Sequence, residues 1–133
     1  MTEIDEIRER RMDELKRGLE HPKEPIEVTD TNLGEILGKY PLVAVDCWAA
    51  WCMPCKIIEP VIEELSREYS GKVVFGKLDV DENRETAMKF GISSIPSLLV
   101  FKEGEMVDRI VGAVPKEHIV ERLKKVGDGI QQL

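Results

Sequence analysis

The sequence is poor in cysteine and in aromatic residues. Its 133 residues include three cysteines and only 5% phenylalanine, tryptophan and tyrosine together. Three cysteines are too few, and odd in number, for the disulfide framework of a small secreted domain. No apolar run approaches the roughly 18 residues of a membrane-spanning helix, and the charged residues 1–8 lack the apolar centre of a secretory signal. We therefore expect a cytoplasmic location, where thiols stay reduced, and no membrane partner.

Positive charge is also in deficit. Lysine and arginine number 19 against 26 aspartate and glutamate residues, so the formal net charge is −7. An acidic balance argues against nucleic acid and anionic membranes as main partners. The length fits one domain with an appendage, long enough to bury about two-thirds of the surface that the unfolded chain exposes.

The chain divides into an appendage, one domain and a short tail. Residues 1–25 are expected to form an amphipathic helix over 3–20, which a proline-containing connector ends. Residues 26–127 form the domain, and residues 128–133 form the C-terminal tail. The leading helix either lies on its own domain or offers a surface to a partner or to a second copy, and the sequence leaves both readings open.

Apolar periodicity within the domain predicts an α/β sandwich. Strands alternate with helices until a final hairpin adds antiparallel strands, which favours a central mixed sheet of about five strands with helices on both faces. Side-chain oxygens of Thr29, Asp30 and Thr31 are candidate N-caps for the first helix. The expected strands lie near residues 26–28, 42–49, 73–79, 97–102 and 106–111, and the expected helices near 31–38, 52–70, 82–90 and 115–127.

Two cysteines, Cys52 and Cys55, follow an apolar run and open a helix-like segment. The thiolate rather than the thiol is the nucleophile, and the partial positive charge of a helix N-terminus favours the thiolate. In a reducing compartment such a pair is typical of a catalytic dithiol or of a metal site. A closed zinc site needs four ligands and the chain has no second pair, so we expect no metal.

Helical geometry distinguishes the two thiols. Steps of three or four residues from Cys55 reach apolar residues, so Cys55 should face inward. The same steps from Cys52 reach Lys56 and Glu59, so Cys52 should be exposed, and it lies nearer the positive end of the helix. We therefore assign Cys52 as the attacking nucleophile and Cys55 as the resolving thiol. Pro54 occupies a first-turn position, where a missing N–H is tolerated.

Asp46 is a carboxylate inside an otherwise apolar strand. Such a group is costly unless its pKa rises or it is paired. The strand leads directly into the cysteine helix, which makes Asp46 a candidate acid/base for Cys55. The alternative is a structural carboxylate bonded to nearby backbone or to Lys77. By alternation, Cys47 points to the opposite face as a small buried residue.

Several stretches together resemble the thioredoxin family over about residues 26–126. They are residues 45–56, which hold both tryptophans and the cysteine pair, residues 91–99, the turn at 102–105, and Gly112. The resemblance implies a thioredoxin fold, a buried acid/base at Asp46 tuned by Lys77, and a cis peptide at Pro96 that positions substrate beside the disulfide. It also implies a substrate-binding surface of Trp51, Met53, Pro54, Ile95 and Gly112.

The activity that the resemblance implies is the reduction of protein disulfides by dithiol–disulfide exchange. The redox-active pair Cys52–Cys55 carries the electrons, so no bound cofactor is expected. The partners would be disulfide-containing client proteins and an electron donor similar to thioredoxin reductase. The family usually has Gly-Pro between the cysteines, whereas this chain has Met53 before Pro54, and that dipeptide influences the reduction potential. An oxidase or isomerase, a glutaredoxin-like protein, and a non-catalytic binding module are the alternatives.

Overall fold

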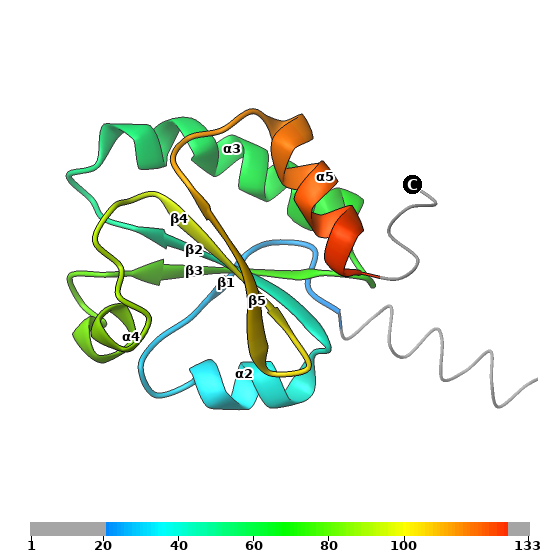
Figure 1. Cartoon of the computed structure of the whole chain (residues 1–133), viewed down its shortest axis with the longest axis horizontal. Coiled ribbons are helices and arrows are strands. Elements are labelled where there is room, and N and C mark those ends of the chain that lie inside the picture. The colour runs from blue at the N-terminus through cyan, green and yellow to red at the C-terminus, as the bar shows by residue number, and fades with distance from the viewer. Residues whose placement is uncertain (1–20, 128–133) are drawn as a thin grey trace, which may run out of the picture.

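The computed structural model describes residues 21–127, which form five strands and four helices (Figure 1). The expected helix over 3–20 lies outside these residues. Every strand and helix predicted between residues 26 and 127 is present, with small shifts at its ends. The strands are β1 (Ile26–Glu27), β2 (Leu42–Trp48), β3 (Val74–Asp79), β4 (Ser97–Lys102) and β5 (Glu105–Val111). The helices are α2 (Leu33–Lys39), α3 (Met53–Glu68), α4 (Arg84–Lys89) and α5 (Lys116–Val126).

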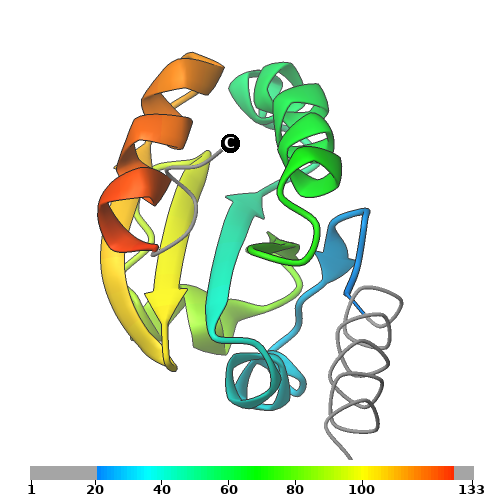
Figure 2. The ribbon, with the colours of Figure 1, turned by 90° about the vertical axis from the view of Figure 1, so that its right-hand side faces the viewer.

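The strands form one mixed sheet in the order β1-β3-β2-β4-β5. β1, β3 and β2 are parallel, β4 pairs antiparallel with β2, and β5 pairs antiparallel with β4. The β4–β5 hairpin turns at Glu103 and Gly104, whose φ angles of 51° and 84° suit a tight two-residue turn. Helices α3 and α5 cover one face of the sheet, and α2 and α4 cover the other (Figures 1 and 2). The predicted mixed sheet with helices on both faces is confirmed.

Strand β2 lies in the middle of the sheet and is covered on both sides. Its residues from Leu42 to Cys47 are all buried, as a near-continuous apolar run predicts. Leu42 and Ala44 pack with α3 and α5, whereas Val43 and Cys47 pack with α2. The predicted division of β2 into two faces is therefore confirmed, and Asp46 shares the face that α3 covers.

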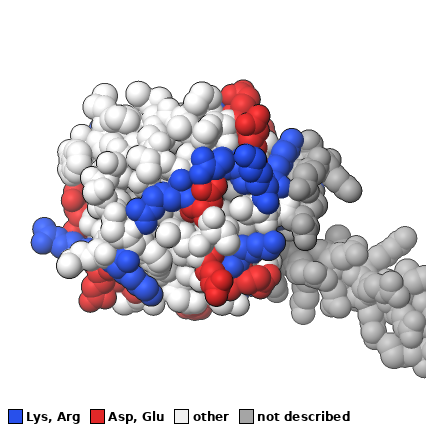
Figure 3. All heavy atoms as spheres, in the orientation of Figure 1, with Lys and Arg blue, Asp and Glu red and all other residues white. Residues whose placement is uncertain are grey.

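Helix α3 begins where the chain leaves β2, so the end of the central strand and the start of this helix form one edge of the molecule (Figure 1). Its inward stripe of Ile58, Ile62 and Leu65 is buried, as the steps from Cys55 predict. A space-filling view shows a mostly uncharged surface over the first part of α3 (Figure 3). Within residues 21–127 the structure has no helix with the length and apolar character to span a bilayer.

The expected caps of the first domain helix are confirmed at Thr29 and wrong at Asp30. The Thr29 hydroxyl accepts the backbone N–H of Asn32 at 3.2 Å, in the turn that leads into α2. Asn32 is the N-cap of α2, and it makes no side-chain cap bond. The carboxylate of Asp30 instead accepts hydrogen bonds from the backbone N–H of Thr86 at 2.8 Å and from its hydroxyl at 2.6 Å, in the first turn of α4. Capping preferences depend on adjacent residues, so they could not predict that the start of a second helix lies within reach of Asp30.

Candidate active site

Cys52 and Cys55 form a disulfide at the start of α3. Cys52 is the N-cap residue, with φ −90° and ψ 108°, and its sulfur accepts the backbone N–H of Cys55 at 3.2 Å. Helix N-termini leave N–H groups unpaired, and a negative charge on the capping atom is stabilised there by these groups and by the helix dipole. The site therefore offers one sulfur a direct N–H donor and the positive end of α3.

The expectation that Cys52 is exposed is wrong for this disulfide form. Cys52 and Cys55 are each 3% exposed. Because Cys52 has extended backbone, its side chain does not continue the exposed stripe of α3. Its sulfur lies 3.8 Å from the carbonyl oxygen of Ile95, and both cysteines pack with Ala49 and with the partly buried Ile95. Cys52 is therefore buried in part by the loop that contains Ile95, which lies more than forty residues later in the sequence.

Pro96 and Gly112, two further residues of the expected site, lie at the same edge of the molecule as the disulfide. The Ile95–Pro96 peptide bond is cis, as the resemblance implies. The backbone N–H of Gly112, a residue with φ 97°, donates to the Pro96 carbonyl oxygen at 2.8 Å, which brings the end of β5 to the same edge. Three chain segments thus meet at the cysteines.

Two large apolar side chains stand on the surface next to Cys52. Trp51 is 69% exposed and Met53 is 66% exposed. The indole N–H of Trp51 donates to the Asp81 carboxylate at 2.9 Å, which fixes the ring while leaving its face open. Pro54 is exposed as well. Exposed aromatic and methionine side chains of this kind are enriched where proteins bind other proteins.

The Asp46 carboxyl group is buried and incompletely bonded. It is 1% exposed, and its Oδ2 has no hydrogen-bond partner among the described residues. Burial raises the pKa of Asp46 to about 7; Lys77 opposes this rise and Glu59 adds to it. A carboxyl group that titrates near neutral pH can both accept and release a proton in a reaction cycle.

A small cavity joins Asp46 to the second cysteine. It measures about 50 Å³ and is lined by Asp46, Trp48, Cys55, Lys56, Glu59 and Lys77. A water molecule needs roughly 10–15 Å³ of such space and two or more polar partners, so the cavity has room for a bridging water. The structure therefore brings Asp46 and Cys55 together, while Cys52 borders the loop at Ile95.

Lys77 and Glu59 complete the cavity. Lys77 is the cross-strand partner of Asp46, and its ammonium lies 3.1 Å from the Glu59 carboxylate and 4.8 Å from the centre of the Trp48 ring. The resemblance anticipates Lys77 as a neighbour of Asp46. Sequence reasoning missed Glu59, which it placed on an exposed polar stripe of α3; the only available sign was a carboxylate one helical turn after Cys55.

Cys47 is separate from this site. Its side chain is fully buried on the opposite face of β2, and burial, with a smaller effect from Asp46, raises the pKa of its thiol to about 12. The thiol therefore stays protonated at neutral pH. Within residues 21–127 no group of three or more histidine, cysteine, aspartate or glutamate side chains is arranged to hold a metal ion.

A cysteine pair at a helix start, a buried carboxyl group behind it and apolar surface in front define a thiol–disulfide exchange protein. Comparison with known proteins agrees, since the family model described as Thioredoxin matches residues 24–125. The chain is 53% identical over 100 residues to a thioredoxin of Staphylococcus haemolyticus (strain JCSC1435), covering 75% of this chain and 95% of the relative. It is 51% identical over 98 residues to thioredoxin 2 of Chlorobaculum tepidum, covering 73% of this chain and 90% of that relative.

A solved structure of a mutant thioredoxin from Halobacterium salinarum NRC-1 superposes with a TM-score of 0.74 at 32% sequence identity, covering 79% of this chain and 92% of that chain. The chain belongs to the thioredoxin family. It is a thiol–disulfide oxidoreductase that reduces protein disulfides.

Proposed function

We propose that Cys52 is the nucleophile and Cys55 the resolving thiol of this reduction. The position of the Cys52 sulfur carries the proposal, because it accepts the Cys55 N–H at the positive end of α3 and lies beside the exposed Trp51. In the first step the Cys52 thiolate attacks one sulfur of a client disulfide. A Cys52–client disulfide forms, and the other client sulfur leaves as a thiolate that takes a proton from solvent.

Asp46 acts in the second step as the base for Cys55. Its carboxylate takes the Cys55 proton across the shared cavity, and the Cys55 sulfur then attacks the Cys52 sulfur. The Cys52–Cys55 disulfide forms while the second client thiolate leaves and takes up, through solvent, the proton that Asp46 releases, which returns Asp46 to its carboxylate form. Two electrons and two protons have then passed from the dithiol to the client, and no bound cofactor takes part. Lys77 tunes Asp46 in this scheme.

Clients bind in an extended conformation at the edge where the cysteines lie. The Ile95 carbonyl oxygen lies beside Cys52, so a client strand that pairs with this backbone has its disulfide next to the nucleophile. Pro96 and Gly112 position this segment through their hydrogen bond. Trp51, Met53 and Pro54 supply exposed surface on the other side of Cys52.

The proposal also covers the electron donor, the location of the protein and the division of the chain. The oxidised pair is returned to the dithiol by an electron donor similar to thioredoxin reductase, and the protein acts in the cytoplasm, where its substrates are continually reduced. Residues 26–127 form the catalytic domain and residues 128–133 a tail. Residues 1–25 form an appendage that either lies on this domain or offers a surface to a partner or a second copy. Reduction by a panel of purified reductases, followed by thiol counting, tests the donor.

Substitution of each cysteine tests the catalytic roles. Cys52→Ser should abolish insulin-disulfide reduction, and Cys55→Ser should accumulate a mixed disulfide with client that gel electrophoresis without reductant detects. Cys47→Ala is the control, because Cys47 lies on the far face of β2, and it should retain activity and folding. Full activity of the Cys52→Ser protein would contradict the mechanism and favour a non-catalytic binding module.

A further inference from the structure

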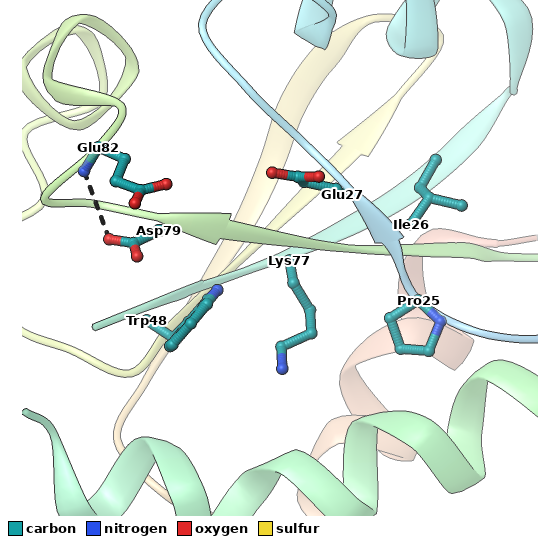
Figure 4. A pocket seen from close by; sticks show the side chains of 7 residues that line it. All are labelled: Pro25, Ile26, Glu27, Trp48, Lys77, Asp79 and Glu82. Carbon is teal, nitrogen blue, oxygen red and sulfur yellow. Dashed lines mark hydrogen bonds between the residues drawn. The ribbon is translucent and has the colours of Figure 1, made fainter. Parts of the chain in front are cut away.

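The side chain of Lys77 borders two spaces. One is the cavity shared with Asp46 and Cys55, and the other is an outer groove of about 350 Å³. Figure 4 shows Lys77 extending from β3 toward α3, away from the carboxylates of Glu27 and Asp79 in that groove. The acidic side chains of the groove therefore do not hold this ammonium.

Glu59 holds the Lys77 ammonium instead. Its carboxylate on α3 forms an ion pair at 3.1 Å, with the Glu59 side chain 42% exposed and the Lys77 side chain 23% exposed. The ammonium also lies over Trp48, at 4.8 Å from the ring centre. Lys77 and Asp46 are cross-strand partners, yet no ion pair within 4 Å joins them among the described residues. Lys77 therefore forms its ion pair with Glu59 of α3 and not with Asp46, its neighbour on β2.

We propose that Glu59 is a positioning residue for the resolving step, holding the Lys77 ammonium against Trp48 and preventing it from pairing with the Asp46 carboxylate. The proposal rests on the base role assigned above to Asp46. An ammonium in direct contact would hold Asp46 as a carboxylate throughout the neutral pH range and weaken it as a base for Cys55. Glu59 keeps the lysine close enough to restrain the carboxyl group without neutralising it.

The groups that face Asp46 come from two packed elements. Helix α3 contributes the Cys55 sulfur, the half-buried Glu59 and the solvent-exposed Lys56, while β3 contributes Lys77. On the other side, the cross-strand partner from β4 is the apolar Leu98. The Glu59 carboxylate raises the pKa of Asp46 and the Lys77 ammonium lowers it, against a larger upward effect of burial. Glu59 and Lys77 therefore have opposite effects on the pKa of Asp46, although they form an ion pair with each other.

Titration of Asp46 in matched glutamate variants tests this role. In Glu59→Gln, the ¹³C NMR titration of the Asp46 carboxyl should move to lower pH by about half a pH unit, which raises its ionised fraction at pH 6 roughly threefold. Glu63→Gln is the control, since Glu63 lies one turn further along α3 and does not line the cavity. The control should leave the titration unchanged.

A second background separates positioning from direct charge. If Glu59 acts through the lysine, Glu59→Gln should move the titration much less in a Lys77→Met protein than in the unmodified protein. No movement in Glu59→Gln alone, or an equal movement in both backgrounds, would overturn the proposal. The base role is tested apart from this by Asp46→Asn: an unchanged rate of mixed-disulfide resolution would remove that role, while the titrations still report on Glu59.

Discussion

The carboxylate of Asp30 caps helix α4 by accepting two hydrogen bonds from Thr86, which lies 56 residues further along the chain. The backbone N–H of Asp30 in turn donates to the Asn83 side chain at 3.0 Å. Helix α4 is short, and its own N-cap residue makes no side-chain cap bond. Because a six-residue helix has little stability of its own, the contact with Asp30 links its formation to the folding of the segment before α2.

Substitution at Asp30 should reveal this dependence. Hydrogen bonds from Thr86 lower the pKa of Asp30 below its usual value of 3.8, so its contribution to the free energy of unfolding is present above that value and is lost as the pH falls through the lowered pKa. Asp30→Ala should lower the urea midpoint at pH 7, whereas Asp30→Asn keeps an acceptor oxygen and should lose less. Equal midpoints for the alanine variant and the unmodified protein would contradict the cap.

Replacement of Asp46 should stabilise the protein at neutral and alkaline pH. Burial raises the pKa of Asp46 from 3.8 to about 7, so the unfolded chain releases its proton at lower pH than the folded one. The free energy of unfolding therefore falls as the pH rises from about 4 to about 7, by at most about 4 kcal/mol. Asp46→Asn should recover up to that amount at pH 8 in urea titrations.

The same comparison at low pH serves as its control. Below about pH 3 the carboxyl group is mostly protonated in both folded and unfolded chains, so Asp46→Asn should then match the unmodified protein. A stability difference that stays constant from pH 3.5 to pH 8 would show that packing of the amide, rather than ionisation, is responsible. If Asp46→Asn resolves the mixed disulfide more slowly although it is more stable at pH 8, the loss of activity does not come from unfolding.

Gly76 has no room for a side chain. It lies in β3 opposite Ile26 of β1, and a Cβ built there would overlap the Cγ2 of Val28. Val28 is fully buried, so it cannot turn freely out of the way. Gly76→Ala should lower the free energy of unfolding by about 1–3 kcal/mol, as overpacking of a filled core does.

A compensating change tests the steric cause. In a Val28→Ala background, Gly76→Ala should destabilise by much less, because the clashing methyl group is gone. A double-mutant cycle of urea unfolding measures the coupling. An unchanged effect in both backgrounds would mean that the alanine acts through the backbone rather than through Val28.

Met53 should contribute to client binding. Its side chain is 66% exposed beside Cys52, and a buried contact of about 1 kcal/mol with client would change kcat/KM about fivefold. Met53→Gly should therefore lower kcat/KM for a client with apolar residues near its disulfide by about that factor. Reaction with oxidised glutathione, which offers little apolar contact, should change less than about twofold. Equal losses with both substrates would mean that Met53 acts on the reactivity of the cysteine pair rather than on client binding. The reduction potential of the Met53→Gly protein should then differ from that of the unmodified protein.

Much of the site could be predicted from local patterns. The alternation along β2 correctly separates Asp46 from Cys47, and the helical steps from Cys55 correctly give its inward face. The steps from Cys52 mislead, because an N-cap residue has extended backbone and does not follow the helical period. The resemblance supplied what spacing alone did not, including the cis peptide bond before Pro96.

The sequence by itself determined the order of strands and helices, the buried run of β2 and the cysteine pair at a helix start, because these depend on periods of two and 3.6 residues and on adjacent capping groups. Only the tertiary structure decided that Ile95 covers Cys52, that Asp30 caps α4 and that Glu59 holds Lys77. Each of these contacts joins segments distant in the chain, and the geometry that brings them within hydrogen-bond or van der Waals range exists only after the sheet has formed.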